Sequence, residues 1–266
     1  MTALESLTRQ LRDEGTKVLV PFLTAGYPDA ATFAALTGAI ARSGCRLMEI
    51  GIPFSDPVAD GPVIQAASQK ALEQGVTLDR VLAMAGQAHR EHGLSVVLMG
   101  YLNPILRFGA APFAAACAEQ GVVGVIVPDL PPEEAGPLRS LLIDQGVSLV
   151  DLAAPTTSPS RLAAIAEQAT GFFYLVSVTG VTGAGISAPE ELADYLDRVA
   201  RHSTLPRYVG FGVNSADQAA RICRQADGVI IGSELIRIID RAAGPDLAVD
   251  DLEAFLTEVN RALGAV

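Results

Sequence analysis

Eight short apolar runs alternate along the chain with longer Ala- and Leu-rich segments. The runs lie at 17–22, 46–50, 95–99, 123–127, 147–152, 172–176, 207–210 and 227–231. They are largely apolar throughout and do not alternate with polar residues, which is typical of strands covered on both faces in a parallel sheet. An eightfold alternation of strand and helix closes naturally into a barrel. The alternative is a doubly wound open sheet, which usually has fewer strands at this length.

The segments between the runs carry helix signals at their ends. Asp29 has the side chain of a helix N-cap, and Pro62 stands at a first-turn position, where its missing N–H costs nothing. Gly93 stands where a helix should end. The predicted helices lie at 29–43, 62–74, 78–92, 110–120, 132–145, 158–168, 189–201, 215–225 and 249–263. We therefore expect a single α/β domain over residues 1–266, a (β/α)8 TIM barrel with an extra N-terminal helix and extra helices in the βα loops.

Composition limits the partners and the compartment. The 266 residues carry a formal net charge of −11, which argues against nucleic acid as a partner, since phosphate binding there needs clustered Lys and Arg. No apolar run reaches the roughly 20 residues of a membrane span, and the N-terminal segment lacks the apolar stretch of a signal peptide. The three cysteines are expected to be buried reduced thiols. Reduced thiols indicate a cytoplasmic protein. His89 and His92 have no evident metal-ligand partners, so we expect no metal site.

Two carboxylates lie at the end of the second predicted strand and in the loop after it, at the end where barrel enzymes hold their active sites. Glu49 lies inside the apolar run LMEIGIPF, where a charge is costly unless it has a task or a partner. The alternative for Glu49 is a buried salt bridge with Arg46. Asp60 comes eleven residues later and directly precedes Gly61 and Pro62. The pattern alone fits an N-cap and a catalytic role equally well for Asp60.

Two loops and a tyrosine at the same end of the predicted barrel are further candidates for the site. The apolar loop GIPFSDPVAD is stiffened by prolines, which indicates either self-packing or a contact surface for another protein. The segment SVTGVTGAG after the sixth strand is rich in glycine, as lid loops are, although a plain flexible loop is the alternative. Tyr174, in the sixth strand, either faces the barrel mouth or fills the core.

The loops after the last two strands predict a phosphate site. Gly210 and Gly212 follow the seventh strand, and Gly232 and Ser233 follow the eighth and open a helix. Barrels often bind phosphate between these loops, because glycines let backbone N–H groups approach an anion closely. The segment GFGVNS also half-matches a dinucleotide fingerprint, but it lacks the third glycine. A phosphate site is the inference that the pattern alone supports best.

Seven segments together resemble the tryptophan synthase α subunit family, whose members are eight-stranded β/α barrels. They are PFLTAGYP (21–28), EIGIPFSDPVADGPVIQ (49–65), MGYLNPI (99–105), PDLPPEE (128–134), SVTGVTGAG (177–185), GFGV (210–213) and IGSELI (231–236). The resemblance implies a carbon–carbon lyase of tryptophan biosynthesis that cleaves indole-3-glycerol phosphate to indole and glyceraldehyde 3-phosphate. It implies no cofactor in this chain.

The resemblance also implies roles for individual residues. Glu49 and Asp60 match the catalytic carboxylates, and Tyr174 matches a supporting tyrosine. Glu49 is implied to take the proton of the C3′ hydroxyl and to carry a proton to C3. Asp60 is implied to accept a hydrogen bond from the indole N–H and to stabilise the positive charge on the ring nitrogen. The implied substrate- and phosphate-binding residues are Phe22, Thr24, Tyr101, Thr182, Gly183, Phe211, Gly212, Gly232 and Ser233.

A protein partner follows from the same resemblance. The family passes indole to a β subunit that uses pyridoxal phosphate, which implies an α2β2 complex, and Pro53, Asp56 and Pro57 match contact positions. One alternative is a freestanding indole-3-glycerol phosphate lyase, which would share the fold and the residues. Another is a non-catalytic barrel that only holds a sugar phosphate, and the presence of both carboxylates argues against it.

Overall fold

The computed structural model describes residues 1–176, 189–210 and 212–266. Its eight strands form a closed parallel barrel, in which each strand pairs with the next and β8 returns to β1. The strands are β1 (Val18–Thr24), β2 (Leu47–Gly51), β3 (Ser95–Met99), β4 (Val122–Ile126), β5 (Ser148–Ala153), β6 (Phe173–Val176), β7 (Arg207–Gly210) and β8 (Gly228–Ile231). Every predicted strand is confirmed to within two residues, and the open-sheet alternative is wrong.

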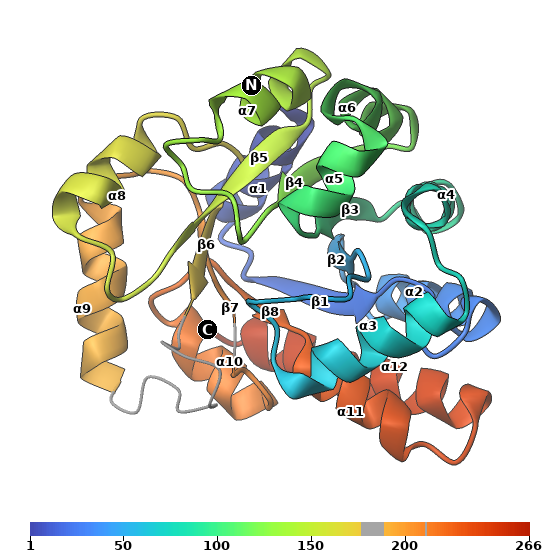
Figure 1. The fold of residues 1–266 in the computed structure, drawn as a ribbon. Helices are drawn as coiled ribbons and strands as arrows, with labels where there is room; N and C mark the ends of the chain where they lie inside the picture. Colours follow the sequence, from blue (N-terminus) through green and yellow to red (C-terminus); the bar gives the residue numbers. More distant parts are fainter. Residues whose placement is uncertain (177–188, 211) are drawn as a thin grey trace.

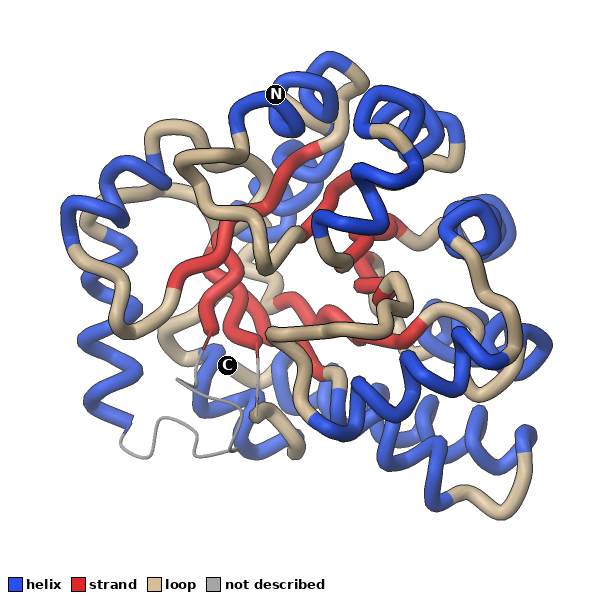
Figure 2. Tube along the Cα trace, viewed as in Figure 1, coloured by secondary structure: helices blue, strands red, loops and turns tan. Residues whose placement is uncertain are grey.

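Helices surround the strands on the outside of the barrel (Figure 1), and Figure 2 shows the ring of strands inside them. Within the described residues they are α1 (Ala3–Asp13), α2 (Ala30–Arg42), α3 (Pro62–Glu73), α4 (Leu78–His92), α5 (Leu102–Phe108), α6 (Ala110–Glu119), α7 (Gly136–Asp144), α8 (Pro159–Ala166), α9 (Pro189–Ala200), α10 (Ala216–Cys223), α11 (Ser233–Arg241) and α12 (Pro245–Leu263). The fold is therefore the predicted (β/α)8 barrel with additional helices.

Local sequence explains where several helices begin and end. The Asp29 carboxylate accepts the backbone N–H groups of Ala31 and Thr32 at 3.0 and 2.9 Å, which confirms the predicted N-cap of α2. Gly93 ends α4 in the left-handed region at φ 67°, where glycine is favoured. Helix α7 begins four residues later than predicted, because the chain after Pro131 first forms turns. The sequence did not predict α5, whose first turn accommodates Pro104.

Helix α1 closes the end of the barrel where the strands begin. Leu4 is fully buried, and a Cβ atom added to Gly124 or Gly171 would lie 2.7 Å from its Cδ2 atom. The Thr8 hydroxyl donates to the carbonyl of Gly171 at 2.7 Å. Because this end is closed by side chains, the open end lies at the C-terminal ends of the strands.

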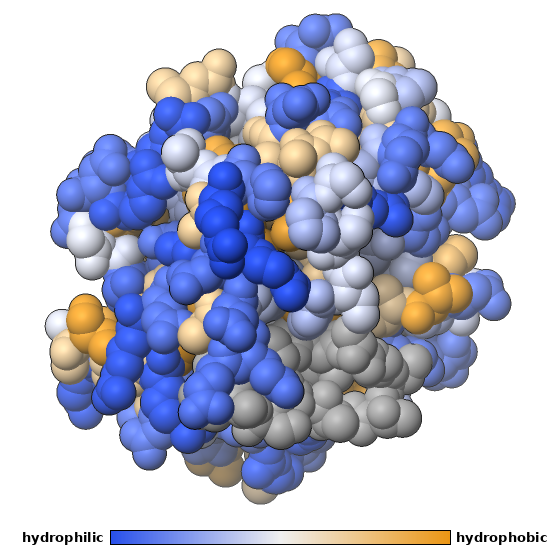
Figure 3. Space-filling model, turned by 90° about the vertical axis from the view of Figure 1, so that its left-hand side faces the viewer, coloured by the Kyte–Doolittle hydropathy of each residue, from blue (hydrophilic) through white to orange (hydrophobic). Residues whose placement is uncertain are grey.

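The interior and the surface agree with the sequence pattern. The apolar strands are buried along most of their length, and β1 is buried throughout. Cys45, Cys117 and Cys223 are free and buried, as predicted. Among the described helices, none has the length and apolar composition needed to cross a membrane. The face around α8 and α9 is covered mainly by hydrophilic residues, with scattered apolar ones between them (Figure 3).

Candidate active site

A cavity of about 980 Å³ lies at the C-terminal ends of the strands. This volume is in the range of sites that bind small molecules. Of the predicted site residues, the cavity is lined by Phe22, Glu49, Asp60, Tyr174, Gly212, Gly232 and Ser233, and Met99 and Ala153 also line it. Thr24 and Tyr101 are buried nearby but are not in the lining. Thr182, Gly183 and Phe211 lie outside the described residues.

Glu49 occupies the centre of β2, paired in register with Phe22 on one side and Val97 on the other. Its side chain is only 1% exposed, and neither carboxyl oxygen has a hydrogen-bond partner among the described residues. The salt bridge with Arg46 considered from the sequence is not formed, since Arg46 pairs with Glu14 at 3.9 Å. Burial, with repulsion from Asp60 as the smaller cause, raises the pKa of Glu49 to about 8. Glu49 therefore holds a proton at neutral pH.

Asp60 lies in the loop between β2 and α3. The sequence allowed two roles for it, the N-cap of α3 and a catalytic group. The N-cap of α3 is Gly61, and no side chain makes a capping hydrogen bond there. Burial raises the pKa of Asp60, and a hydrogen bond from the Tyr101 hydroxyl opposes this by lowering it. The same hydroxyl accepts the backbone N–H of Ala59 at 3.0 Å. Tyr101 thus holds the Asp60 segment in place, and the Asp60 carboxylate is left to face the cavity.

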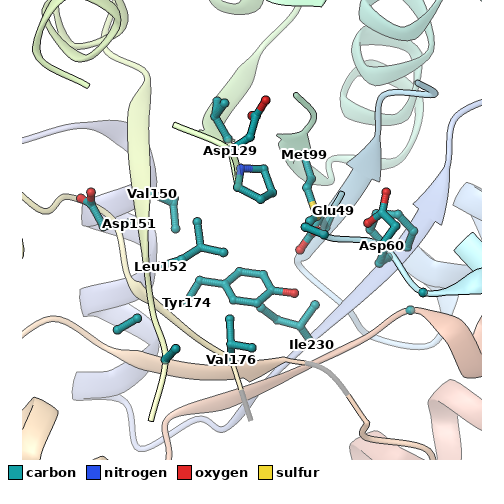
Figure 4. Close-up of a pocket in the computed structure, with 18 of the residues that line it drawn as sticks. Glu49, Asp60, Met99, Asp129, Val150, Asp151, Leu152, Tyr174, Val176 and Ile230 are labelled. Atoms are coloured by element: carbon teal, nitrogen blue, oxygen red, sulfur yellow. The ribbon is translucent and has the colours of Figure 1, made fainter. Parts of the chain in front are cut away.

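Tyr174 reaches the cavity from β6, on the side opposite β2. Figure 4 shows the phenol of Tyr174 and the carboxyl of Glu49 pointing toward each other. Gly210 of β7 provides the space for this ring, because a Cβ atom added there would lie 2.5 Å from the Tyr174 hydroxyl oxygen. Burial and, to a smaller extent, the two carboxylates raise the pKa of Tyr174. Tyr174 is therefore a neutral hydrogen-bonding group facing Glu49.

The predicted phosphate-binding segment begins at the end of β8. Gly232 is the N-cap of α11, and no side chain caps the helix there. The first helical hydrogen bond runs from the N–H of Ile236 to the Gly232 carbonyl at 3.2 Å, so the N–H groups before Ile236 have no helical acceptor. A Cβ atom on Gly232 would lie 3.1 Å from Phe22, so the backbone there passes close to the ring. Helix N-termini of this form bind anions.

The loop that leads to Asp60 joins the cavity to the surface. Asp56 is exposed and Pro57 is partly exposed, whereas Pro53 is buried within this chain. Val58 is 74% exposed although it is apolar. The ring of Phe54 packs on the ring of Tyr101, with 5.3 Å between the centroids. The exposed part of the loop is thereby connected, through Tyr101, to Asp60.

Several cavity residues were missed by the sequence analysis. Asp129 follows β4 and accepts the N–H of Leu102 at 2.9 Å, so it fixes the start of α5. The rule that polar residues after a barrel strand face the mouth would have found Asp129. Arg237 and Glu234 line the cavity from α11, and nothing in their local sequence distinguishes them from surface helix residues. Within the described part of the chain, no three His, Cys, Asp or Glu side chains cluster as metal ligands would.

Comparisons with known proteins agree with this geometry. The family model described as "Tryptophan synthase alpha chain" matches residues 8–263. Proteins of that name from Laribacter hongkongensis and Dechloromonas aromatica are 45% and 42% identical to this chain, covering 100% of the chain in both cases and 100% and 99% of the relatives. The crystal structure of tryptophan synthase subunit alpha from Legionella pneumophila superposes with a TM-score of 0.91 at 34% identity, over 100% of both chains.

Proposed function

Because the chain belongs to the tryptophan synthase alpha chain family, we propose that it cleaves indole-3-glycerol phosphate to indole and glyceraldehyde 3-phosphate. The observation that supports this most directly is the position of Glu49. It is a buried carboxyl group without a hydrogen-bond partner among the described residues, and it faces a cavity shared with Asp60 and Tyr174. A retro-aldol cleavage needs a group that gives and takes protons at the bond that breaks.

Glu49 supplies both proton transfers in this proposal. With a pKa near 8 it begins protonated and gives its proton to C3 of the indole, leaving a positive charge on the ring nitrogen. The resulting carboxylate then removes the proton of the C3′ hydroxyl. The C3–C3′ bond breaks as the aldehyde forms, and its electrons return to the indole ring. Glu49 ends the cycle protonated, so no external acid or base is consumed.

Asp60 stabilises the intermediate charge. As a carboxylate it accepts a hydrogen bond from the indole N–H, where positive charge develops after C3 is protonated. The hydrogen bond from Tyr101 favours the ionised form of Asp60 against the effect of burial. Tyr174 directs its phenol toward Glu49 and orients the proton that Glu49 carries.

The phosphate of the substrate binds at the other end of the cavity. Backbone N–H groups at the start of α11, after Gly232, and the segment around Gly212 are its binding partners in this proposal. The first-turn N–H groups are not used within the helix, and the helix dipole adds a positive potential at this end. Binding the phosphate there places the indole toward Glu49 and Asp60.

The chain acts with a β subunit that uses pyridoxal phosphate, and we propose an α2β2 assembly in the cytoplasm. Support comes from apolar side chains that remain exposed: Val58, which lies on the β2–α3 loop and lines the cavity, and Leu106 on α5. The Phe54–Tyr101 contact holds these two elements together. A partner that covers this surface would act on Asp60 through Tyr101, and indole would leave the cavity beside the contact.

The test is the release of indole and glyceraldehyde 3-phosphate by the purified chain, alone and with a tryptophan synthase β subunit. We expect cleavage in both cases and faster cleavage with the partner. Equal rates with and without the partner would favour the freestanding lyase. Absence of both products under both conditions would contradict the proposed function.

A further inference from the structure

The cavity described above is a poor electrostatic environment for a phosphate ester. The chain has a net charge of −11. Of the acidic residues among the described lining, Glu49 holds a proton and Asp151 is paired with Arg139, which leaves Asp60, Asp129 and Glu234. A phosphate group brings close to two further negative charges. The N-terminus of a helix offers the equivalent of only about half a positive charge. A cationic side chain near the phosphate would offset this imbalance.

Two basic side chains are among the described lining residues, Arg161 and Arg237. Arg161 lies on α8, after β5, and is paired with Glu133 at 3.1 Å. Arg237 lies on α11, the helix whose N-terminus follows Gly232. Arg237 is therefore the cation on the element that carries the proposed phosphate site.

The position of Arg237 along the helix directs it toward that site. It follows Ser233 by four residues and Glu234 by three, so the three residues share one face of α11. Long helical side chains lean toward the N-terminus of their helix, and the Arg237 Nη1 atom lies 3.2 Å from Glu234 Oε2. The Arg237 side chain is 48% exposed, which leaves its other N–H groups open to a ligand.

Glu234 is held by two arginines. Its Oε2 atom faces Arg237, and its Oε1 atom faces Arg241 at 2.5 Å. Alone, a carboxylate in the first turn of α11 would repel a phosphate. With both arginines the three side chains carry a net charge of +1, and Arg237 is the arginine of the two that lines the cavity. Glu234 thus serves as an anchor that keeps the Arg237 guanidinium beside the first turn.

We propose that Arg237 binds the phosphate of the substrate directly, and that Glu234 positions it for this contact. The proposal rests on the proposed function for the identity of the substrate. It adds a charged side chain to a phosphate site otherwise built from backbone N–H groups, and it makes substrate capture sensitive to ionic strength.

The experiment must distinguish direct binding of the phosphate by Arg237 from neutralisation of the Glu234 charge by Arg237. The variants are Arg237→Gln and Arg241→Gln, each made in the natural chain and again with Glu234→Gln. Arg241 is the matched control, because it has the same charge and the same partner but does not line the cavity. The Arg237 and Arg241 side chains are exposed, whereas Glu234 is only 17% exposed, so the folding of every variant is verified by thermal unfolding before kinetics are measured.

With Glu234→Gln as the background, we expect Arg237→Gln to raise KM for indole-3-glycerol phosphate about tenfold and to leave kcat within about twofold, as loss of one charge-assisted hydrogen bond would. Arg241→Gln in that background should change KM less than about twofold. The effect of Arg237→Gln should shrink at high salt. The dissociation constant of inorganic phosphate, measured by calorimetry, should rise in parallel.

Three results would overturn the proposal. One is a rise in KM for Arg237→Gln that vanishes in the Glu234→Gln background, which would mean that Arg237 only neutralises the charge of Glu234. Another is an equal effect of Arg237→Gln and Arg241→Gln in that background. The third is an unchanged KM and phosphate affinity. Calorimetry needs no turnover, so a chain that binds phosphate through Arg237 but forms no indole would contradict the proposed function and leave this inference standing.

Discussion

Asp60 raises the pKa of Glu49 across the cavity, in addition to the larger effect of burial. The two carboxyl groups thereby differ in what they do at neutral pH. Glu49 keeps its proton, and Asp60 receives a hydrogen bond from Tyr101 that favours its ionised form. Pairs of acids whose environments separate their pKa values are typical of general acid–base sites.

The coupling itself is testable by titration. Asp60→Asn removes the negative charge facing Glu49, so we expect the pKa of Glu49 to fall below its value of about 8 in the natural chain. The remaining shift should still be upward, because burial is the larger cause. Carbon-13 NMR of labelled glutamate side chains measures the titration midpoint of Glu49 in the natural chain and in Asp60→Asn. The Glu49→Gln variant assigns the signal. An unchanged midpoint in Asp60→Asn would show that the two groups do not interact.

Glu49 also makes folding stability depend on pH. Its pKa rises from the ordinary 4.5 to about 8 on folding, so the native state holds a proton that the unfolded state loses between these values. The free energy of unfolding therefore decreases as the pH rises from about 4.5 to 8. Glutamine cannot ionise, so we expect Glu49→Gln to be more stable than the natural chain by about 3–5 kcal/mol at pH 9.

At pH 4 the same pair should differ by less than about 1 kcal/mol, because Glu49 is then protonated in both states. Urea denaturation at the two pH values measures both differences. A difference that does not grow with pH would mean that Glu49 is ionised in the folded chain.

Gly210 is expected to be required for the position of Tyr174. A methyl group on Gly210 would lie 2.5 Å from the Tyr174 hydroxyl oxygen and 2.6 Å from its Cε1 atom, so the ring would have to move. We expect Gly210→Ala to lower kcat about 10–100-fold, since small displacements of catalytic groups have effects of this size. Gly136→Ala is the control, because a Cβ atom there meets nothing within 4 Å. Equal activity of the two variants would show that Gly210 is not required for the position of Tyr174.

The sequence predicted the barrel well because continuous apolar strands and helix caps are local signals. It could not separate the two acids found inside apolar strands. Glu49 in β2 has no partner among the described residues, whereas Asp151 in β5 pairs with Arg139 of α7 at 2.7 Å. Both have the same appearance in the sequence. The difference arises from a helix that packs across the strand, which no local pattern records.

The Arg139–Asp151 pair gives a prediction of its own. Both side chains are less than 10% exposed, so removal of one partner leaves a buried charge. We expect Arg139→Met to lower the free energy of unfolding by about 3–5 kcal/mol, and Arg139→Met with Asp151→Leu to recover most of this loss. Chemical denaturation of the single and the double variant measures both changes in the free energy of unfolding. A single variant as stable as the natural chain would mean that Asp151 is already neutral.

Asp60 shows a second limit of local patterns. An acid before Gly and Pro at a helix start fits a cap as well as a catalytic group. The backbone geometry excludes the cap, because Gly61 occupies the N-cap position, and Tyr101, 41 residues further along the chain, holds the Asp60 segment. The role of Arg237 was equally hidden, since it depends on which face of α11 meets the cavity.

The most direct test of the proposed chemistry is the rate of indole release by Glu49→Gln, measured together with its affinity for glyceraldehyde 3-phosphate. Glutamine keeps the size of the side chain but neither gives nor takes the proton. We expect the rate to fall at least about 10³-fold while the dissociation constant stays within about twofold, since general acid–base groups contribute about 10²–10⁴-fold. Near-normal indole release with the same ligand affinity would contradict the role of Glu49.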